Sequence, residues 1–399
     1  MSGTGPGQGP EDDPFRGLPI FGDLARMLQG QGPVSWDAAR QFAVMIASEG
    51  KAEANIDPLH RIRLEELARV ADLHVSEVTG LATSLTGRPI QVLPVTPGVW
   101  AQRSLEAYRP LFERLAQALS TPAPGTEPDE LGGDPAAAFL GGFVQLLTPM
   151  MLGMAAGSMV GHLARRCFGQ YDLPLPRPPA DELLVLSGRI DEVAEQWSLP
   201  LDDLRLWVCV HELTHHAVLG LPHVRARLLE LIGAFVSGFR PNPHALEERL
   251  GSMELADPQS LAGLQDVLGD PSVLLGAMRT AEQEAVVPQL DALVAVIVGY
   301  ADHVIDVVGG RLLGSFGMLA EALRRQRVEA DPSDRFVEEL LGLSLGTAQV
   351  ERGAAFVKGV LERAGETGLA RLWTSARSLP TPAEVDAPGL WLARLEYDE

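Results

Sequence analysis

Cysteine and positive charge are both scarce in this chain. Cys167 and Cys209 are the two cysteines among 399 residues, which excludes a disulfide scaffold and a cysteine-based zinc finger. Lysine and arginine total 32 against 53 aspartates and glutamates, so the formal net charge is −21. Because so acidic a surface repels phosphate backbones and anionic lipid headgroups, we expect no nucleic-acid partner. The same acidity also suits a protein that needs no charged partner and simply stays in solution.

The first residues lack the features of a secretory signal. Residues 1–13 consist largely of glycine, proline and acidic side chains, with no basic region and no apolar stretch. The sequence therefore predicts a cytoplasmic protein with a disordered tail at residues 1–16.

One long stretch has no charged side chain. Residues 135–164 contain no Asp, Glu, Lys or Arg, and the run is long enough to span a bilayer. Gly153, Gly157 and Gly161 repeat within it at a spacing of four, which favours a close approach of two helices. Pro149 and the many glycines lower its hydropathy, so we predict a helix buried in the protein core, with a membrane span as the alternative.

The remaining pattern is mainly helical. Amphipathic helices are predicted at 36–48, 59–78 and 99–119, and nearly throughout after residue 200. In the second helix the expected buried face comprises Leu59, Ile62, Leu67, Val70 and Val78. Two short apolar runs of strand length lie at 89–94 and 182–187. We therefore expect a mainly α fold with a small β element.

Proline, glycine and acidic residues are most concentrated at residues 121–135. This composition is typical of a linker. It divides the sequence into a tail (1–16), an N-terminal helical region (17–120), the linker (121–135) and a larger C-terminal region (136–399) that carries the chemistry.

That chemistry centres on the run His211-Glu212-Leu213-Thr214-His215. Asp202 or Asp203 is expected to cap the helix that holds it, and the pair Gly220 and Pro222 to end it. Histidines at i and i+4 project from one side of a helix, as two ligands of a tetrahedral zinc ion require. Glu212 lies beside the first ligand, where it can take a proton from a metal-bound water.

A catalytic zinc site also needs a third protein ligand from elsewhere. In the otherwise apolar run 293–308, Asp302, His303 and Asp306 interrupt the pattern. Buried acids and histidines in such surroundings pair with something. His216 points about 100° away from His215 and is expected in the second shell or the core, and Cys209 is expected in the core.

The chain resembles a family of bacterial zincin-like metallopeptidases, some of whose members are named as associated with the biosynthesis of a deazaflavin coenzyme. The residues that carry this resemblance are Gly32-Pro33-Val34-Ser35-Trp36, Gly169-Gln170-Tyr171-Asp172-Leu173-Pro174-Leu175-Pro176, Leu206-Trp207-Val208-Cys209-Val210-His211-Glu212-Leu213-Thr214-His215-His216, Gly299-Tyr300-Ala301-Asp302-His303 and Pro388-Gly389-Leu390-Trp391-Leu392-Ala393-Arg394. It implies a zincin-like fold, with zinc bound by His211 and His215 and with Glu212 as general base.

In one respect the chain departs from that family. A glutamate commonly precedes the glycine that is Gly299 here, whereas this chain has Val298. Asp302 lies one turn further along nearly the same helix face and is predicted as the third metal ligand. The alternative is His303, a good ligand that points about 140° away from the direction of Val298.

The sequence thus predicts a zinc-dependent hydrolase, a metallopeptidase that acts on a peptide or protein substrate through a metal-activated water. Tyr300 is a candidate for stabilising the oxyanion, and the strand at 182–187 is expected to pair with an extended substrate. Two alternatives remain open. Val298 favours a degenerate zincin fold that acts as a non-catalytic binding or scaffold protein, and residues 135–164 favour a membrane-embedded metalloprotease.

Overall fold

The computed structural model describes residues 32–84, 86–120, 135–240, 279–328, 337, 340–344 and 346–397, without the side chains of 135–147 and 326–328. The predicted tail and almost all of the predicted linker therefore lie outside the described residues.

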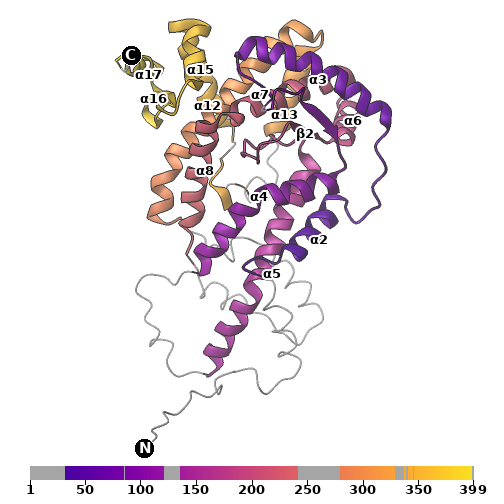
Figure 1. Ribbon diagram of the computed structural model, residues 1–399, viewed down its shortest axis with the longest axis vertical. Coiled ribbons are helices and arrows are strands. Elements are labelled where there is room, and N and C mark those ends of the chain that lie inside the picture. Colours follow the sequence, from indigo (N-terminus) through magenta and orange to yellow (C-terminus); the bar gives the residue numbers. More distant parts are fainter. Residues whose placement is uncertain are drawn as a thin grey trace, which may run out of the picture.

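The described chain is mainly helical (Figure 1). Its α-helices are α2 (Trp36–Ala47), α3 (Pro58–Thr79), α4 (Pro97–Ser120), α5 (Pro135–Arg166), α6 (Ser187–Gln196), α7 (Leu201–Gly220), α8 (Pro222–Ser237), α12 (Ala281–Leu312), α13 (Phe316–Val328), α15 (Thr347–Ala370), α16 (Pro382–Asp386) and α17 (Pro388–Tyr397). Two 3₁₀ turns, η1 (Arg371–Trp373) and η2 (Ala376–Ser378), join α15 to α16. The predicted mainly α fold is confirmed, and so are the three helices that the sequence placed before residue 120.

The small β element is a two-stranded parallel sheet. Strand β1 (Gln91–Pro94) pairs with β2 (Glu182–Val185), with Val92 opposite Leu183. On the other side of β2, the backbone N–H of Leu186 donates to Phe168 O (2.7 Å), and Gly169 bridges to Val185. Both sides of β2 are thus occupied. The expectation that this strand offers a free edge to an extended substrate was wrong, because the loop after α5 already lies along that edge.

Helix α7 runs through the middle of the helical body and contacts α3, α6, α8 and α12. Every residue from Leu204 to Leu219 is buried. The helix begins after Pro200, with no side-chain cap, so the predicted capping by Asp202 or Asp203 was wrong. Both acids instead lie in the first turn, where Asp202 pairs with Arg63 of α3 (2.8 Å). In that position, the negative charges of both acids still interact favourably with the positive end of the helix dipole.

The glycine repeat in α5 makes the predicted close helix contact, and the structure shows that the partner helix is α2. A Cβ on Gly153 would meet the backbone oxygen of Ser35, one on Gly157 that of Ala39, and one on Gly161 the Ile46 side chain (2.7 Å). Residues Met151 and Leu152 and most positions up to Ala164 are buried. The core helix is therefore confirmed for this part of the uncharged run, while the side chains of 135–147 lie outside the described residues.

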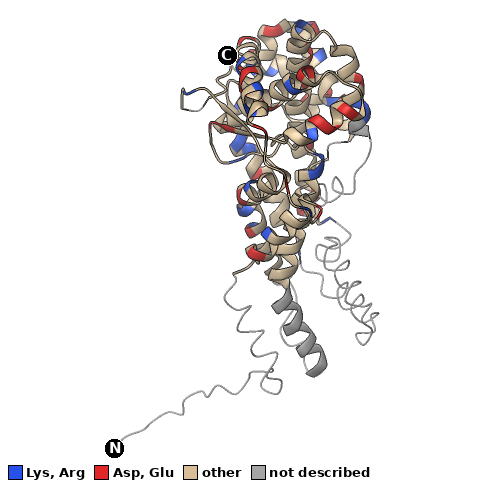
Figure 2. Ribbon diagram, turned by 90° about the vertical axis from the view of Figure 1, so that its right-hand side faces the viewer, with Lys and Arg blue, Asp and Glu red and all other residues tan. Residues whose placement is uncertain are grey.

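Among the described helices, α12 is long and apolar enough to cross a bilayer. However, 72% of its most apolar stretch is buried inside the protein. Burial of that kind is typical of a core helix. In Figure 2, acidic and basic residues are interspersed over the helical body rather than gathered by sign.

The buried face of α3 differs from the prediction. Leu59, Ile62 and Val70 are exposed, whereas the buried side chains are those of Leu64, Leu67, Ala68, Ala71, Val75 and Thr79. The alanines explain the difference, because small side chains let α3 approach α7 closely and were given no weight in the apolar pattern.

The predicted N-terminal and C-terminal regions share one hydrophobic core in their described parts. Helix α2 contacts α5, α3 contacts α7, and α4 contacts both α5 and α8. One buried cluster includes Leu64 and Trp100 together with Val208 and Val296. The division at residues 121–135 stays a prediction about chain organisation.

The α2–α5 contact can be tested with a single methyl group. We expect Gly157→Ala to lower the free energy of unfolding by about 1–3 kcal/mol, because overpacking against the α2 backbone outweighs the gain in helix propensity. Gly310 of α12 is exposed, with nothing within 4 Å of an added Cβ. Gly310→Ala is therefore the matched control, expected to be neutral or stabilising by up to about 1 kcal/mol. Equal denaturation midpoints for the two variants would contradict a close helix contact.

Candidate metal centre

His211 and His215 lie one turn apart on α7, deep in the protein. His211 is 5% exposed and His215 is 3% exposed, and the centroids of their rings are 4.4 Å apart. Trp207, one turn before His211, stacks on the His211 ring with centroids 5.2 Å apart. The two imidazoles are therefore held next to each other by helix geometry and by packing.

The hydrogen bonds of the two rings indicate which nitrogens can bind a metal. Nδ1 of His215 lies 3.0 Å from the backbone oxygen of His211. Since a carbonyl oxygen only accepts, this Nδ1 carries the proton, and Nε2 is the nitrogen that can act as ligand. Nδ1 of His211 lies 3.1 Å from Oε1 of Glu212. Such Nδ1–H contacts to oxygen orient the histidine ligands of metal sites.

Glu212 is fully buried and held by the loop that follows α5. Backbone N–H groups of Gln170 and Tyr171 donate to its Oε2, at 2.8 and 3.0 Å. A Cβ on Gly169 would lie 2.6 Å from its Oε1, so the carboxylate occupies space that only a glycine leaves open. Gly169 is fixed in turn by Trp100 of α4, whose Nε1–H donates to its backbone oxygen (2.9 Å). This contact ties α4, the loop and α7 together.

The surroundings of Glu212 shift its proton affinity. Burial raises the pKa of Glu212 to about 8, opposed by the two backbone N–H groups and by the charge of Arg177. Arg177 lies over the rings of Trp100 and Tyr108 and donates to Ser104 Oγ (2.7 Å). Glu212 is thus a carboxyl group that can hold or release a proton near neutral pH, as a general base needs.

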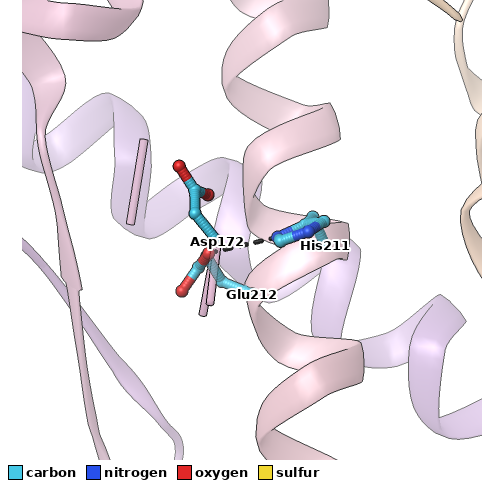
Figure 3. A group of neighbouring side chains, drawn as sticks. All are labelled: Asp172, His211 and Glu212. Atoms are coloured by element: carbon cyan, nitrogen blue, oxygen red, sulfur yellow. Dashed lines mark hydrogen bonds and ion pairs between the residues drawn. The ribbon is translucent and has the colours of Figure 1, made fainter. Parts of the chain in front are cut away.

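Asp172 lies close to His211 and Glu212 (Figure 3). In the described part of the chain, one set of three or more potential ligands has all its ligand atoms within 4.8 Å of one another, and it consists of Asp172, His211 and Glu212. The backbone N–H of Phe168 donates to Oδ2 of Asp172 (2.7 Å). Loss of water around the carboxylate, together with the nearby charge of Glu212, raises the pKa of Asp172. The sequence analysis assigned no role to Asp172, although this residue lies inside the run 169–176 that carries the family resemblance.

His216 and Tyr171 lie behind this group. The Tyr171 hydroxyl is 3.0 Å from Nδ1 of His216, while Nε2 of His216 has no hydrogen-bond partner. Burial lowers the pKa of His216 to about 4, so the ring is neutral. The Tyr171 ring also stacks on His215, with centroids 6.4 Å apart. His216 is therefore a buried neighbour of the site, and Tyr171 is a contact that sequence reasoning missed.

The candidates on α12 do not belong to this group of three. Asp302 is half-buried and does not join the set of ligand atoms around His211. His303 Nε2 instead lies 3.2 Å from Glu366 Oε1 of α15. Val298 is partly buried and packs against the core, and the Tyr300 ring packs edge-on against Trp373 (5.1 Å). The assignment of Asp302 as third ligand stays a prediction.

The donor set fits a metal ion at the two imidazoles. Each ring has its Nδ1 next to an oxygen, as oriented histidine ligands do, and carboxylate oxygens of Asp172 and Glu212 lie within 4.8 Å of a ligand nitrogen of His211. Nitrogen and oxygen donors of this kind are those that zinc takes in catalytic sites.

The buried state of Glu212 predicts a pH effect on stability. An acid whose pKa is raised by folding binds its proton more tightly in the folded state, so stability falls as pH rises from about 4.5 to about 8. Glu212→Gln keeps an acceptor for the two backbone N–H groups but cannot ionise. In metal-free protein we expect the variant to gain stability over the unaltered chain as pH rises from 5 to 8.5, measured by thermal unfolding. Parallel pH profiles for the two proteins would contradict the assignment.

Comparisons with known proteins place this geometry in a family. The profile of the zincin-like metallopeptidases matches residues 34–392. A solved structure from Chloroflexus aurantiacus, described as that of a proposed hydrolase with a novel fold, is 24% identical and superposes with a TM-score of 0.61, covering 91% of this chain and 99% of its own. At that identity it supports the fold alone. No curated protein matches the chain. Because the profile spans nearly the whole sequence, the chain belongs to the zincin-like metallopeptidase family.

Proposed function

We propose that this protein is a zinc-dependent hydrolase that cleaves peptide bonds, with His211 and His215 as metal ligands and Glu212 as general base. The observation that carries the proposal is the pair of adjacent buried imidazoles whose Nδ1 atoms both face oxygen acceptors. Membership of the zincin-like family supports a hydrolase of the metallopeptidase kind.

A zinc ion bound there would polarise a substrate carbonyl and lower the pKa of a water molecule toward neutrality. The chain supplies the proton acceptor. Backbone N–H groups of Gln170 and Tyr171 hold Oε2 of Glu212, and Oε1 lies 3.1 Å from Nδ1 of His211. Of the two oxygens, Oε1 is the one on the side of the metal ligand, where a proton would be taken up and passed on. Burial of Glu212 excludes bulk water from that oxygen and raises its proton affinity into the range useful near neutral pH.

A second candidate is a zincin fold that binds without catalysis. Val298 favours it, because an apolar side chain stands where the resemblance implies a carboxylate. The present contacts of Glu212 favour it too, since Oε2 accepts two backbone hydrogen bonds and Oε1 lies against His211. In this alternative Glu212 fastens the loop to α7 and moves no proton.

Metal content tests the ligand assignment. We expect purified protein to hold about one zinc ion per chain, as three-ligand catalytic sites do. The double variant His211→Ala, His215→Ala should hold none, measured by elemental analysis. His303→Ala is the matched histidine control and should keep its zinc, because His303 pairs with Glu366 on another face of α12. Full zinc occupancy in the double variant would remove the basis of the proposal.

Peptide cleavage separates the two candidates. Incubation with a mixed peptide library, read by mass spectrometry, should yield new termini with the zinc-loaded protein. Glu212→Gln should lower the cleavage rate by about 10²- to 10⁴-fold, the usual contribution of a general base. Cleavage that survives this substitution would exclude Glu212 as the base. Zinc binding without any cleavage would favour the non-catalytic alternative.

A further inference from the structure

The described part of α12 does not supply an evident third protein ligand for the proposed metal site. Catalytic zinc sites use three protein ligands, and His211 and His215 supply two. Val298 offers no ligand atom, and His303 is engaged with Glu366. Asp302, like His215, is not one of the three residues whose ligand atoms lie within 4.8 Å of one another. The missing ligand is therefore best sought on another element that contacts α7.

The loop between α5 and β2 is such an element. Two hydrogen bonds, from the backbone N–H groups of Gln170 and Tyr171 to Glu212, hold this loop against α7. Asp172 follows directly, and its carboxylate lies within 4.8 Å of ligand atoms of both His211 and Glu212. In Figure 3 the Asp172 and Glu212 carboxylates lie on the same side of the His211 ring.

Charge gives an independent reason for a cation at this place. Two carboxyl groups close together in a poorly hydrated site repel each other when both are ionised. A bound divalent cation is often the largest local charge in such a site and reverses that repulsion. The Phe168 N–H donates to Oδ2 of Asp172 and so holds this carboxylate in the cluster.

We propose that Asp172 is the third protein ligand of the metal ion, in place of a ligand from α12. This inference rests on the proposed zinc site at His211 and His215. Ligand atoms of a tetrahedral zinc ion are about 3.3 Å apart, given bonds of about 2.0–2.1 Å. Asp172 and His211 offer ligand atoms within 4.8 Å of each other, and a bound zinc ion would draw them to that separation. Glu212, anchored by two backbone N–H groups, keeps the role of base.

The role of Asp172 is separable from its structural hydrogen bond. Asp172→Asn keeps an oxygen that can accept from the Phe168 N–H but removes the charge and the strong metal ligand. Zinc affinity is measured by competition with a colorimetric zinc indicator, and the thermal shift on adding zinc is a second readout. Loss of an outer-shell partner costs about 10- to 100-fold in metal affinity. For a direct ligand we therefore expect Asp172→Asn to weaken zinc binding by at least about 100-fold.

Asp302→Asn is the matched control, because it alters the same residue type at the rival position. We expect it to change zinc affinity by less than about threefold, well below the loss of about 10- to 100-fold that removal of an outer-shell partner causes. Unchanged affinity in Asp172→Asn, or a larger loss in Asp302→Asn, would overturn the inference while leaving the two-histidine site intact. Zinc binding that survives removal of both His211 and His215 would instead overturn the proposed function.

Discussion

The burial of one carboxylate organises the centre of this protein. Glu212 has no contact with solvent, and a buried carboxylate is costly unless hydrogen bonds compensate for the lost water. The compensation comes from two consecutive backbone N–H groups, those of Gln170 and Tyr171. To present them, the loop must approach α7 so closely that residue 169 can carry no side chain. The position of the loop therefore follows from the electrostatic need of the glutamate.

That loop position has further consequences for the fold. Because Phe168 and Gly169 lie along β2, the strand has neighbours on both sides. Because the Gly169 oxygen accepts from Trp100, α4 is fastened to the same point. Asp172 and Tyr171 are brought to the histidines by the same short stretch of backbone. The sheet, the N-terminal helices and the metal centre thus depend on a single contact between the loop and α7.

Close packing between helices supplies the rest of the framework. Small residues allow it in α5 against α2 and again where Gly299 of α12 meets Gly353 of α15. Helix α12 lies against α7 mainly through apolar side chains, including Ile305 and Val308 opposite Trp207. A valine at position 298 is compatible with such a contact. The carboxylate ligand proposed for the zinc site, Asp172, comes instead from the loop after α5.

Much of this protein could be predicted from local sequence patterns. The His211–His215 spacing fixes two imidazoles on one helix face, since helix periodicity is a local property. The glycine repeat at 153, 157 and 161 marked a close helix contact for the same reason. Local patterns failed where tertiary partners mattered. The buried face of α3 includes alanines that the apolar pattern did not count, and α7 begins without the predicted aspartate cap.

The sequence by itself determined the helical class, the family and the pair of histidines with Glu212 between them, because each depends on residues a few positions apart. Only the tertiary structure decided that Gln170 and Tyr171 hold Glu212 and that Asp172 lies beside His211. It also decided that β2 has no free edge. These contacts join residues about forty positions apart in the chain, and no periodicity encodes them. They arise because a buried carboxylate must find hydrogen-bond donors, and two consecutive backbone N–H groups of the loop after α5 supply them.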